Sequence, residues 1–364
     1  MSLNGGVGRG TLDAGNKLSG ATAYVGFNKQ YQHFVNYFLC DGVADDVQMN
    51  WATTYVSGLG GGSVELECEA YNNVATVNVP AGVTVRGHGN DTVVNYDAGG
   101  SCFTVTGDNS KIHDLKVVIV AGAGAGGTRP NCVYAANRVN LECRGLWLVG
   151  DETVGDDGSD TRQCGIVFSG VTYSRINFCR SNDHTRHGIF LYSSSDDNTV
   201  TGNTCNGNTL YGIYLYSSSN DNTVTGNTCN GNTQYGIYLY SSSDNTVTGN
   251  TCNGNDSEDT GTYDGISLSG STGNLIGSNT CKDNDRWGIM VDADSDYNKV
   301  SNNYTDGNTA GSIRVNNANC DSNQIEFNTV EEGAPGDVGT LTRSYGNYDP
   351  SANAFVGDVG AAPF

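Results

Sequence analysis

The feature that most constrains this chain is a unit of 24 residues that occurs three times in almost identical form. The copies begin at Gly188, Gly212 and Gly236, and the second reads GIYLYSSSNDNTVTGNTCNGNTQY. Looser copies begin at Gly165, Gly265, Gly288 and Ser312. A fixed period of this length predicts a solenoid, a propeller or another repeat array.

The residues within one period indicate which of these architectures the chain adopts. GIYLYSS alternates between two faces, with Ile237 and Leu239 on one side and Tyr238 and Tyr240 on the other, as expected of a strand. NTVTGN and NTCNGN are two further short β-prone runs, bounded by turn residues. A propeller blade needs about 40 residues, and no helical spacing is present. The repeat therefore predicts an all-β parallel β-helix of about ten rungs with three strands per rung.

Strands that stack in register turn each repeat position into a column of equivalent residues. Asn203, Asn227 and Asn250 lie at one turn, where their side chains are expected to bond to one another and to the backbone. A cysteine column is predicted to supply small apolar core residues with free thiols, in place of a disulfide framework or a metal site. Its expected members are Cys179, Cys205, Cys229, Cys252 and Cys281, beside inward columns of Ile189, Ile213, Ile237 and Ile289, of Leu191, Leu215, Leu239 and Val291, and of Val200, Val224 and Val247.

The net charge of −21 limits the partners that the chain is expected to bind. It disfavours nucleic acid and anionic membrane surfaces, and it is compatible with calcium, with a saline medium or with simple solubility. No apolar run reaches the roughly 18 residues that a membrane span requires. No secretion leader is visible, so the expected location, which is extracellular, on a cell surface or in a virion, follows from the fold's roles alone.

The pattern divides the chain into an N-terminal arm and capping helix (1–62), a parallel β-helix (63–330) and an irregular C-terminal tail (331–364). The helix is expected to begin at Asp45 or Asp46 and to end at Gly58. It would cover the first rung with an apolar face. The residues predicted for that face are Val47, Trp51, Ala52, Tyr55 and Val56.

Two segments resemble known families. DGVADD, GGGSVELE and VPAGVTVRGHG, between residues 40 and 89, resemble the entry segment of the pectate-lyase superfamily of right-handed β-helices. The repeats between 165 and 330 are similar to those of archaeal surface proteins and of periplasmic nitrous-oxide-reductase accessory proteins. Both resemblances imply a right-handed parallel β-helix, for which carbohydrate is the commonest ligand. Neither fixes an activity, because function depends on the site.

Aromatic side chains are expected to form the substrate-binding surface. They alternate outward in two columns of three, about 4.8 Å apart from rung to rung. Flat rings with a polar edge suit sugars, whereas cross-strand stacking or a subunit contact would explain the columns without a ligand. The residues are Phe190, Tyr192, Tyr214, Tyr216, Tyr238 and Tyr240.

The densest cluster of titratable residues lies beside the first of these rungs, in SNDHTRHG. A uronan lyase or epimerase needs a cation to neutralise the sugar carboxylate, a base and an acid. A hydrolase needs two carboxylates instead, for which Asp196 and Asp197 are further candidates. Asn182–His184 resembles the Asp-Pro-His element of alginate epimerases without its proline, and the Arg-Ile-Lys element of polygalacturonases is absent. The predicted catalytic residues are Asp183, His184, Arg186 and His187, with Asp160 and Arg162 one rung earlier.

A third candidate is the acidic turn DADSDYN. Asp292, Asp294 and Asp296 alternate as in a calcium loop, but Tyr297 stands where the loop requires glycine. A solvated acidic turn is the alternative explanation. No cofactor is required by the sequence, and calcium is the one ion that it suggests. Three methionines and five histidines do not supply a soft-metal cluster for copper.

Together these patterns predict a carbohydrate-active protein that binds or acts on a polysaccharide, as a lyase, an epimerase or a hydrolase. A non-catalytic glycan-binding or surface-layer protein and a virion tailspike or fibre are the alternatives. The chain is expected to be a monomer or a homotrimer.

Overall fold

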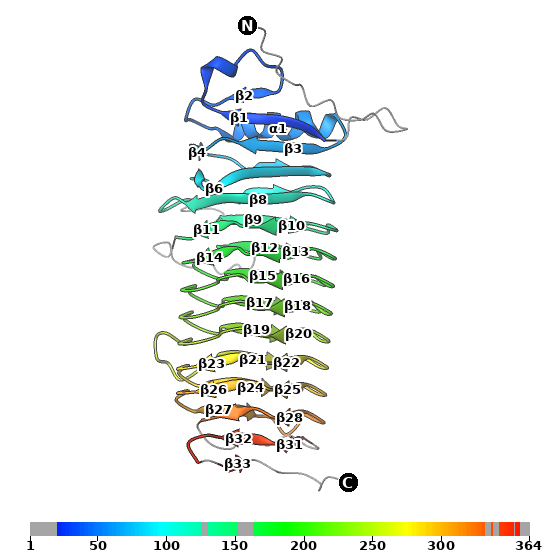
Figure 1. The fold of residues 1–364 in the computed structure, drawn as a ribbon, viewed down its shortest axis with the longest axis vertical. Helices are drawn as coiled ribbons and strands as arrows, with labels where there is room; N and C mark the ends of the chain where they lie inside the picture. The colour runs from blue at the N-terminus through cyan, green and yellow to red at the C-terminus, as the bar shows by residue number, and fades with distance from the viewer. Residues whose placement is uncertain are drawn as a thin grey trace.

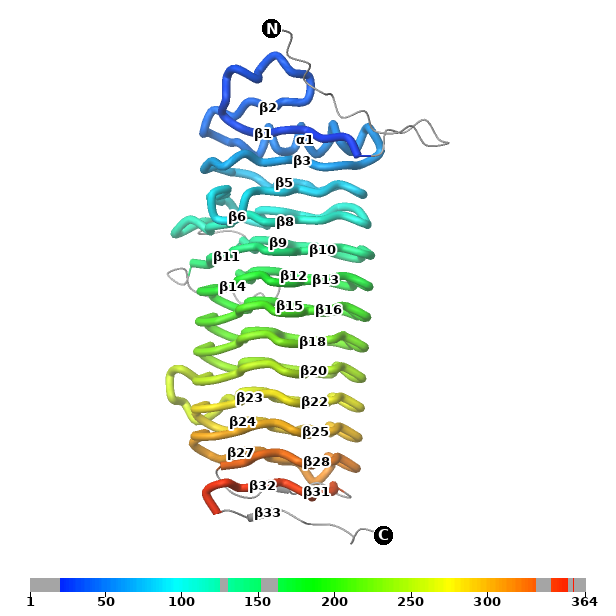
Figure 2. The backbone as a smooth tube through the Cα atoms, viewed as in Figure 1, coloured from blue at the N-terminus to red at the C-terminus, as the bar shows by residue number. Residues whose placement is uncertain are grey.

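The computed structural model describes residues 20–124, 130–151, 163–331, 336–337, 342–352 and 354–356. The chain winds into a tall stack of rungs, with residues 20–39 at one end of the stack and residues 342–352 at the other (Figure 1, Figure 2). Neighbouring strands pair in parallel along the stack, and the last pair, β32 with β33, is antiparallel. The predicted parallel β-helix is confirmed.

In the described residues, one face of the stack is a sheet of 11 strands from successive rungs. Its inward columns are confirmed, because Ile189 pairs with Ile213 and Ile213 with Ile237, and the leucines two residues on pair in the same way. The strands are β5 (Val77–Val79), β7 (Ser101–Val105), β9 (Asn131–Ala136), β12 (Ile166–Ser169), β15 (Ile189–Tyr192), β17 (Ile213–Tyr216), β19 (Ile237–Tyr240), β21 (Ile266–Ser269), β24 (Trp287–Asp292), β27 (Gly311–Val315) and β30 (Gly336–Asp337).

The other strands form a second and a third face, which meet at a corner. β6 and β8 are long enough to run through this corner, whereas later rungs break there into two short strands. The strands of these faces are β1 (Ala21–Gly26), β2 (Tyr37–Leu39), β3 (Gly62–Leu66), β4 (Ala70–Asn73), β6 (Val83–Tyr96), β8 (Lys111–Ile119), β10 (Glu142–Arg144), β11 (Trp147–Val149), β13 (Arg175–Asn177), β14 (Arg180–Asn182), β16 (Thr199–Thr201), β18 (Thr223–Thr225), β20 (Thr246–Thr248), β22 (Leu275–Gly277), β23 (Thr280–Lys282), β25 (Lys299–Ser301), β26 (Tyr304–Asp306), β28 (Gln324–Glu326), β29 (Thr329–Val330), β31 (Arg343–Tyr345), β32 (Asn347–Asp349) and β33 (Ala354–Val356).

The third face is less regular in the near-identical repeats than the sequence predicts. Thr204, Thr228 and Thr251 form isolated parallel bridges in place of a full strand. The reason is a side chain that replaces a backbone acceptor: the N–H of Asn230 donates to Oδ1 of Asn206 at 2.8 Å. A ladder of asparagine amides thus continues where the backbone ladder stops.

Buried asparagine side chains connect the rungs at three corners. Oδ1 of Asn227 accepts from the backbone N–H and from Nδ2 of Asn203, both at 2.9 Å, and its own Nδ2 donates to the carbonyl of Val200 at 2.9 Å. The predicted bonding of this column is confirmed. The sequence analysis found one of the three columns, which are Asn203, Asn227, Asn250, Asn279, Asn303, Asn328 and Asn347; Asn198, Asn222, Asn245, Asn274, Asn298 and Asn323; and Asn208, Asn232, Asn255, Asn284 and Asn308.

The glycine that begins each repeat is required by the close approach of successive rungs. A Cβ atom on Gly212 would lie 2.7 Å from the carbonyl oxygen of Gly236, and one on Gly236 would lie 2.6 Å from that of Gly265. Real side chains do not tolerate such distances, so glycine recurs at this position.

The cysteine column forms at Cys205, Cys229, Cys252 and Cys281, all of them buried free thiols. Its predicted continuation to Cys179 is wrong. Ser181 lies one rung before Cys205, whereas the N–H of Cys179 donates to Oδ1 of Asn203, so Cys179 occupies the asparagine column.

The capping helix α1 (Asp46–Gly58) is present, but its inward face differs from the predicted one. Ala52 and Val56 are buried as predicted, whereas Trp51 is 59% exposed and Val47 38% exposed. Met49 and Thr53 are buried in their place. Two aspartates at the start of the helix determine its orientation, as their contacts show.

Asp45 and Asp46 are buried and accept hydrogen bonds from the backbone of the adjacent rung. Oδ2 of Asp45 accepts from the N–H of Asn72 at 2.8 Å, and Oδ1 of Asp46 accepts from that of Val74 at 2.9 Å. Asp45 therefore precedes the helix as predicted, but its side chain does not cap it. The DGVADD segment joins the helix to the stack.

Strand pairing extends beyond both ends of the predicted repeat region. β1 pairs with β3, and β31 pairs with β28, so the first and last rungs lie within segments that the sequence analysis assigned to an arm and a tail. Neither segment repeats the 24-residue pattern, which is why periodicity did not show them. The division of the chain at residues 62 and 330 stays a prediction.

Replacing Asn227 with alanine should weaken the stack. The substitution leaves the N–H of Asn203 and the carbonyl of Val200 buried without these partners, at a cost of about 1–3 kcal/mol for each group. Urea unfolding followed by circular dichroism should show a clear fall in midpoint. Thr223→Ala, on the outward side of β18, is the control and should change the midpoint little. Equal midpoints for the two variants would contradict a structural role of the amide ladder.

Candidate functional site

The predicted catalytic turn is buried. His184, Arg186 and His187 are at most 5% exposed, and only Asp183 reaches the surface. The cavity beside His184 measures about 20 Å³, which has room for one water molecule and no sugar. Asp160 and Arg162 lie outside the described residues. The prediction of an accessible acid–base pair here is wrong, because the turn folds inward under the adjoining rungs.

Burial also determines the protonation of the two histidines. The His187 ring stacks on Tyr211 at 4.8 Å and lies 5.0 Å from the ring of Phe190. Burial, reinforced by the charge of Arg186, holds the pKa of His187 well below its ordinary value. Burial lowers the pKa of His184 to about 3. Both rings are therefore neutral near pH 7.

The two aromatic columns form, but they are only partly open to ligand. The rings of Phe190 and Tyr214 stack at 5.0 Å, and those of Tyr214 and Tyr238 at 5.3 Å. Phe190 is fully buried and Tyr214 nearly so, whereas Tyr240 is 41% exposed. The predicted sugar contact of Phe190 does not fit this geometry. The accessible part of the face is Tyr192, Tyr216, Tyr238 and Tyr240.

Two of the three aspartates of the acidic turn, Asp292 and Asp296, accept hydrogen bonds from nearby backbone groups. Oδ1 of Asp292 accepts from the N–H of Ala293 at 2.8 Å, and Oδ1 of Asp296 accepts from that of Asp321 at 2.6 Å. Asp294 is exposed. Across the described ranges, no three acidic, histidine or cysteine side chains gather as a metal site would require. The structure thus does not bring these three residues together around calcium.

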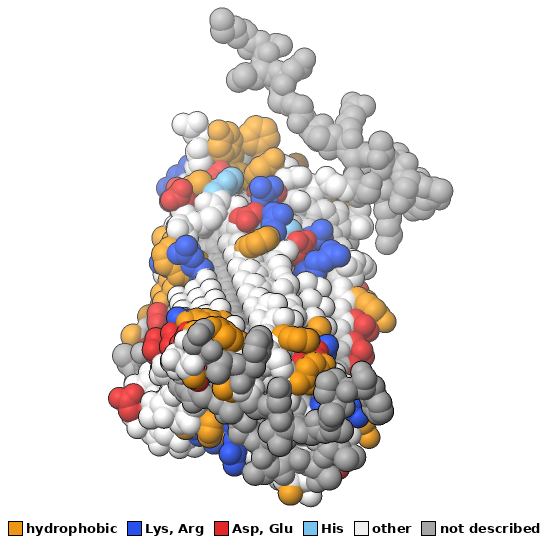
Figure 3. All heavy atoms as spheres, turned by 60° about the horizontal axis from the view of Figure 1, so that its bottom comes forward, with side chains coloured by type: hydrophobic (Ala, Val, Ile, Leu, Met, Phe, Trp, Pro, Cys, Tyr) orange, Lys and Arg blue, Asp and Glu red, His pale blue; other side chains and the backbone are white. Residues whose placement is uncertain are grey.

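The sequence analysis missed a group of charged residues on the second face. In the repeats the two outward positions of this face are threonines, such as Thr199 and Thr201. The same two columns hold charged residues in the rungs nearer the N-terminus. Figure 3 shows the contrast, with a long stripe of uncoloured side chains and charged ones gathered beyond it. The residues in these columns are Arg86, Lys111, His113, Glu142, Arg144 and Arg175.

These residues form two ionic clusters. Asp114 lies between two arginines, with its Oδ2 3.6 Å from Nε of Arg86 and 3.2 Å from Nη2 of Arg144. In the other cluster, Oε2 of Glu142 lies 3.5 Å from Nζ of Lys111 and 3.2 Å from Nε2 of His113. The clusters interleave, because His113 and Arg144 are cross-strand neighbours.

The second cluster holds a neutral imidazole against a carboxylate. Burial lowers the pKa of His113, although Glu142 opposes this effect. Burial alone would raise the pKa of Glu142, but the charges of His113 and Lys111 bring it below its ordinary value. At neutral pH Glu142 is ionised, and His113 can accept a proton.

Around the corner, a tryptophan lies between two cations. Trp147 pairs with Lys116 on one side and with Arg180 on the other. Nζ of Lys116 lies 4.6 Å from the centre of the indole ring and Cζ of Arg180 lies 5.5 Å from it, so both contacts are cation–π interactions.

Phe178 projects from the corner itself and is 65% exposed. Its backbone is left-handed, with φ at 55°, a conformation that Gly202 adopts in the next rung and that Phe327 adopts at the same corner near the C-terminal end. We name the surface formed by Arg86, Lys111, Lys116, Arg144, Trp147, Arg175, Phe178 and Arg180 the basic platform.

The basic platform leads into a groove at the N-terminal rungs. The groove has a volume of about 480 Å³ and lies over β1, β3 and β6. Arg86 belongs to both the groove and the platform. The other residues that line it are Thr22, Tyr24, Glu65, Leu66, Glu67 and His88.

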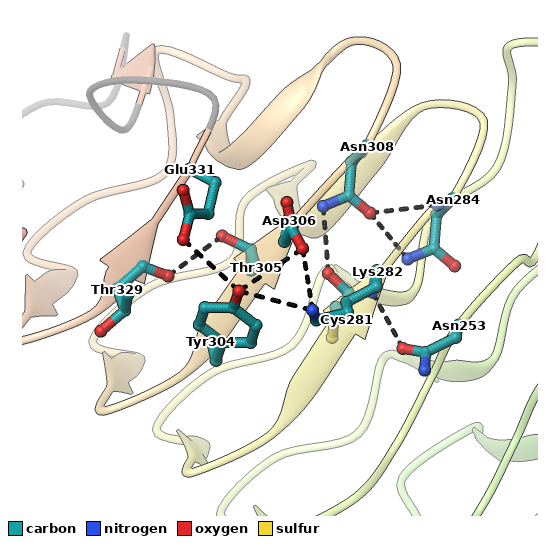
Figure 4. Close-up of polar contacts among 10 residues, drawn as sticks. All are labelled: Asn253, Cys281, Lys282, Asn284, Tyr304, Thr305, Asp306, Asn308, Thr329 and Glu331. Carbon is teal, nitrogen blue, oxygen red and sulfur yellow. Dashed lines mark hydrogen bonds and ion pairs between the residues drawn. The ribbon is translucent and has the colours of Figure 1, made fainter. Parts of the chain in front are cut away.

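A smaller polar cluster lies near the C-terminal end of the third face (Figure 4). Nζ of Lys282 donates to Oδ2 of Asp306 at 2.8 Å and lies 4.4 Å from the ring centre of Tyr304. The hydroxyl of Tyr304 lies 3.4 Å from Oε1 of Glu331. Its groups satisfy one another, so it resembles a surface ion-pair network more than a ligand site.

Comparison with known proteins agrees with this architecture. A family model described as a right-handed β-helix region matches residues 211–355, and one described as periplasmic copper-binding protein (NosD) matches residues 130–263. The chain is a right-handed parallel β-helix protein. A search of curated protein sequences found no match.

Several solved structures resemble this β-helix protein. The A-module of a mannuronan C-5 epimerase from Azotobacter vinelandii has 17% identity and a TM-score of 0.66, with coverage of 90% of this chain and 99% of that chain. The Dettilon tailspike protein has 18% identity and a TM-score of 0.72, over 92% and 66%. The catalytic domain of an α-1,3-glucanase has 15% identity and a TM-score of 0.51, over 82% and 63%. Identities this low show a shared fold alone.

A sequence signal for the basic platform does exist in this β-helix protein. The triplet TVT of β16, β18 and β20 aligns with RIN at 175–177, ECR at 142–144 and KIH at 111–113. Once strand pairing aligns these irregular rungs with the repeat, their charged residues fall at the threonine positions. In the described part of the chain, no helix is long and apolar enough to cross a membrane.

The two buried histidines predict a loss of stability in mild acid. Below about pH 6.5 the unfolded chain binds protons that the folded chain excludes, down to about pH 3 for His184. The free energy of unfolding should therefore decrease as the pH is lowered, by up to about 1.4 kcal/mol per pH unit for each histidine. Urea midpoints measured between pH 7.5 and 5 test this dependence. His187→Phe should reduce the dependence of the urea midpoint on pH, and His33→Ala, at an exposed histidine, should leave it unchanged. Identical slopes in the wild-type protein and both variants would contradict the role of the buried histidines.

Proposed function

We propose that this protein is carbohydrate-active and binds an acidic polysaccharide across the basic platform. The observation that carries the proposal is the concentration of positive charge. The chain has a net charge of −21 and only 18 lysines and arginines, yet six of them lie on this one surface, where they outnumber the two carboxylates with which they pair, Asp114 and Glu142. Such a concentration of one charge against the net charge of the protein is typical of a site for anions.

The aromatic residues of the platform favour a sugar polymer over a small anion. Phe178 presents an exposed apolar ring that suits the C–H face of a sugar ring, and the two cations held over the ring of Trp147 suit its carboxylates or sulfates. Two of the similar structures also support a sugar polymer as the ligand, since their names are those of a mannuronan epimerase and an α-1,3-glucanase.

The exposed tyrosines of the first face supply a second sugar contact in this proposal. Tyr216 and Tyr240 stack at 5.5 Å on successive rungs and leave their hydroxyl edges accessible. Between Phe190 and Tyr240 these two columns consist of aromatic residues and carry no cation, so this part of the face fits neutral stretches of a polymer. Cross-strand stacking without a ligand remains the alternative explanation.

We also infer a location outside the cytoplasm, in the periplasm, at a surface or on a virion. The periplasmic family model and the tailspike similarity support this location. Monomer and homotrimer remain the candidate assemblies. Sedimentation equilibrium distinguishes them, and a trimer would favour the tailspike alternative.

Affinity electrophoresis with acidic polysaccharides, neutral polysaccharides and duplex DNA tests the proposed function. Trp147→Ala and Arg180→Ala should each weaken binding of the acidic polymer about tenfold, or about 1.4 kcal/mol, because the first removes the ring that holds both cations and the second removes a charged contact. The control is Lys299→Ala, since Lys299 lies in the outward column of Lys111 and Arg175 but far along the stack. Unchanged binding in both platform variants, or equal binding of neutral polymers, would contradict the proposal. Preference for DNA would also contradict it.

A further inference from the structure

His113 lies among the cations of the basic platform but is nearly buried. In its outward column it stands between Arg86 on one neighbouring strand and Arg144 on the other. Although this column faces outward, the side chain of His113 is only 7% exposed. Its Nε2 atom is buried and has no hydrogen-bond partner among the described residues. Because buried polar atoms are nearly always hydrogen-bonded, this exception requires an explanation.

The charges around His113 act on its ring in opposite directions. Oε2 of Glu142 lies 3.2 Å from Nε2 of His113 and favours a protonated ring, as does the carboxylate of Asp114. The charges of Arg144 and Lys111 disfavour it. Burial is the largest effect, and the pKa of His113 lies below its ordinary value as a result. In the free protein the ring is therefore neutral near pH 7, beside a carboxylate that can pair with its protonated form.

An anionic polymer on the platform would change this balance. Its carboxylate or sulfate groups would pair with Arg86, Arg144 and Lys111 and neutralise the charges that repel a protonated ring. A proton taken up at Nε2 has an acceptor in Glu142, and hydrogen bonds between charged groups are stronger than neutral ones. Because His113 is nearly buried, solvent screens these charges only weakly. Binding should therefore favour protonation of His113, and by reciprocity protonation should strengthen binding.

We propose that His113 takes up a proton when an acidic polysaccharide binds the platform, so that affinity for the polymer increases as the pH falls. The inference rests on the proposed function and adds the regulation of that site. The proton comes from the solvent, binds Nε2 of His113 and pairs with Oε2 of Glu142, and it returns to the solvent when the polymer leaves. His113 acts through the charges of the platform and needs no contact with the sugar.

The expected pH dependence follows from the two protonation states of the ring. Well above the pKa that the ring has in the complex, it is neutral in the free and in the bound protein, and affinity does not vary with pH. As the pH falls, the complex is protonated before the free protein, so affinity increases by at most about tenfold per pH unit for one proton. Affinity becomes constant again once the free protein is protonated as well.

Isothermal titration calorimetry with dextran sulfate and with polygalacturonate tests this linkage. Each polymer is titrated at pH 7.5 and at pH 6, in two buffers that differ in their enthalpy of ionisation. The sulfate and carboxylate groups stay ionised over this range, so a change in affinity comes from the protein. Affinity should be about three- to tenfold higher at pH 6, and the dependence of the enthalpy on the buffer should show net proton uptake. Circular dichroism at both pH values checks that the protein is folded.

Three variants assign the proton. His113→Gln removes the titratable ring and keeps an amide that can bond to Glu142, so its affinity should be equal at both pH values, with no proton uptake. Glu142→Gln removes the acceptor of the proton and should reduce the pH dependence, which tests the proposal whether or not His113→Gln folds. His33→Gln, at an exposed histidine outside the platform and the groove, is the control and should retain the pH dependence of the wild-type protein.

The outcomes separate the proton linkage from the platform itself. Tighter binding at pH 6 with proton uptake, both lost in His113→Gln, supports the proposal. Equal affinity of the wild-type protein at the two pH values, proton release, or unchanged proton uptake in His113→Gln would overturn it and leave the platform intact. Absence of binding to either polymer at both pH values would instead overturn the proposed function.

Discussion

The fold depends on one interaction, the hydrogen bonding of a buried asparagine amide to the rung beside it. Asn227 accepts a backbone N–H of one rung and donates to a backbone carbonyl of that rung, while its own N–H donates to Asn250 of the next. The same arrangement occurs at three corners of each regular rung. Turns leave backbone groups without partners, and these groups would be costly if buried alone. The amides supply the partners, and they fix the rungs in register.

Because inward-facing residues stabilise the stack, its outward-facing positions can vary in sequence. The inward columns of Ile, Leu, Val and Asn persist from rung to rung, whereas the outward columns change from threonine to charged residues toward the N-terminus. The basic platform and the groove lie where the repeat is least regular.

Much of the regular part of the stack could be predicted from the sequence. The Ile and Leu columns, the cysteine column from Cys205 onward and the Asn203 column all follow from a period of 24, because strand stacking converts period into position. The helix face and the burial of His184 and His187 could not be predicted in this way. The helix face depends on the hydrogen bonds that Asp45 and Asp46 accept from the adjacent rung, and the burial of the histidines depends on the direction in which their turn folds. Neither is encoded in the local pattern of polarity.

The sequence by itself determined the architecture, since a repeated alternation of apolar residues with a turn residue at a fixed period has few ways to bury its core. Only the tertiary structure decided the site. Lys116, Trp147 and Arg180 are more than 30 residues apart in sequence and become neighbours by parallel pairing of β8, β11 and β14. The groove joins β1, β3 and β6 in the same manner. The irregular rungs differ too much in length for the 24-residue period to align their sequences. Contacts between side chains on neighbouring irregular rungs can therefore be identified only in the tertiary structure.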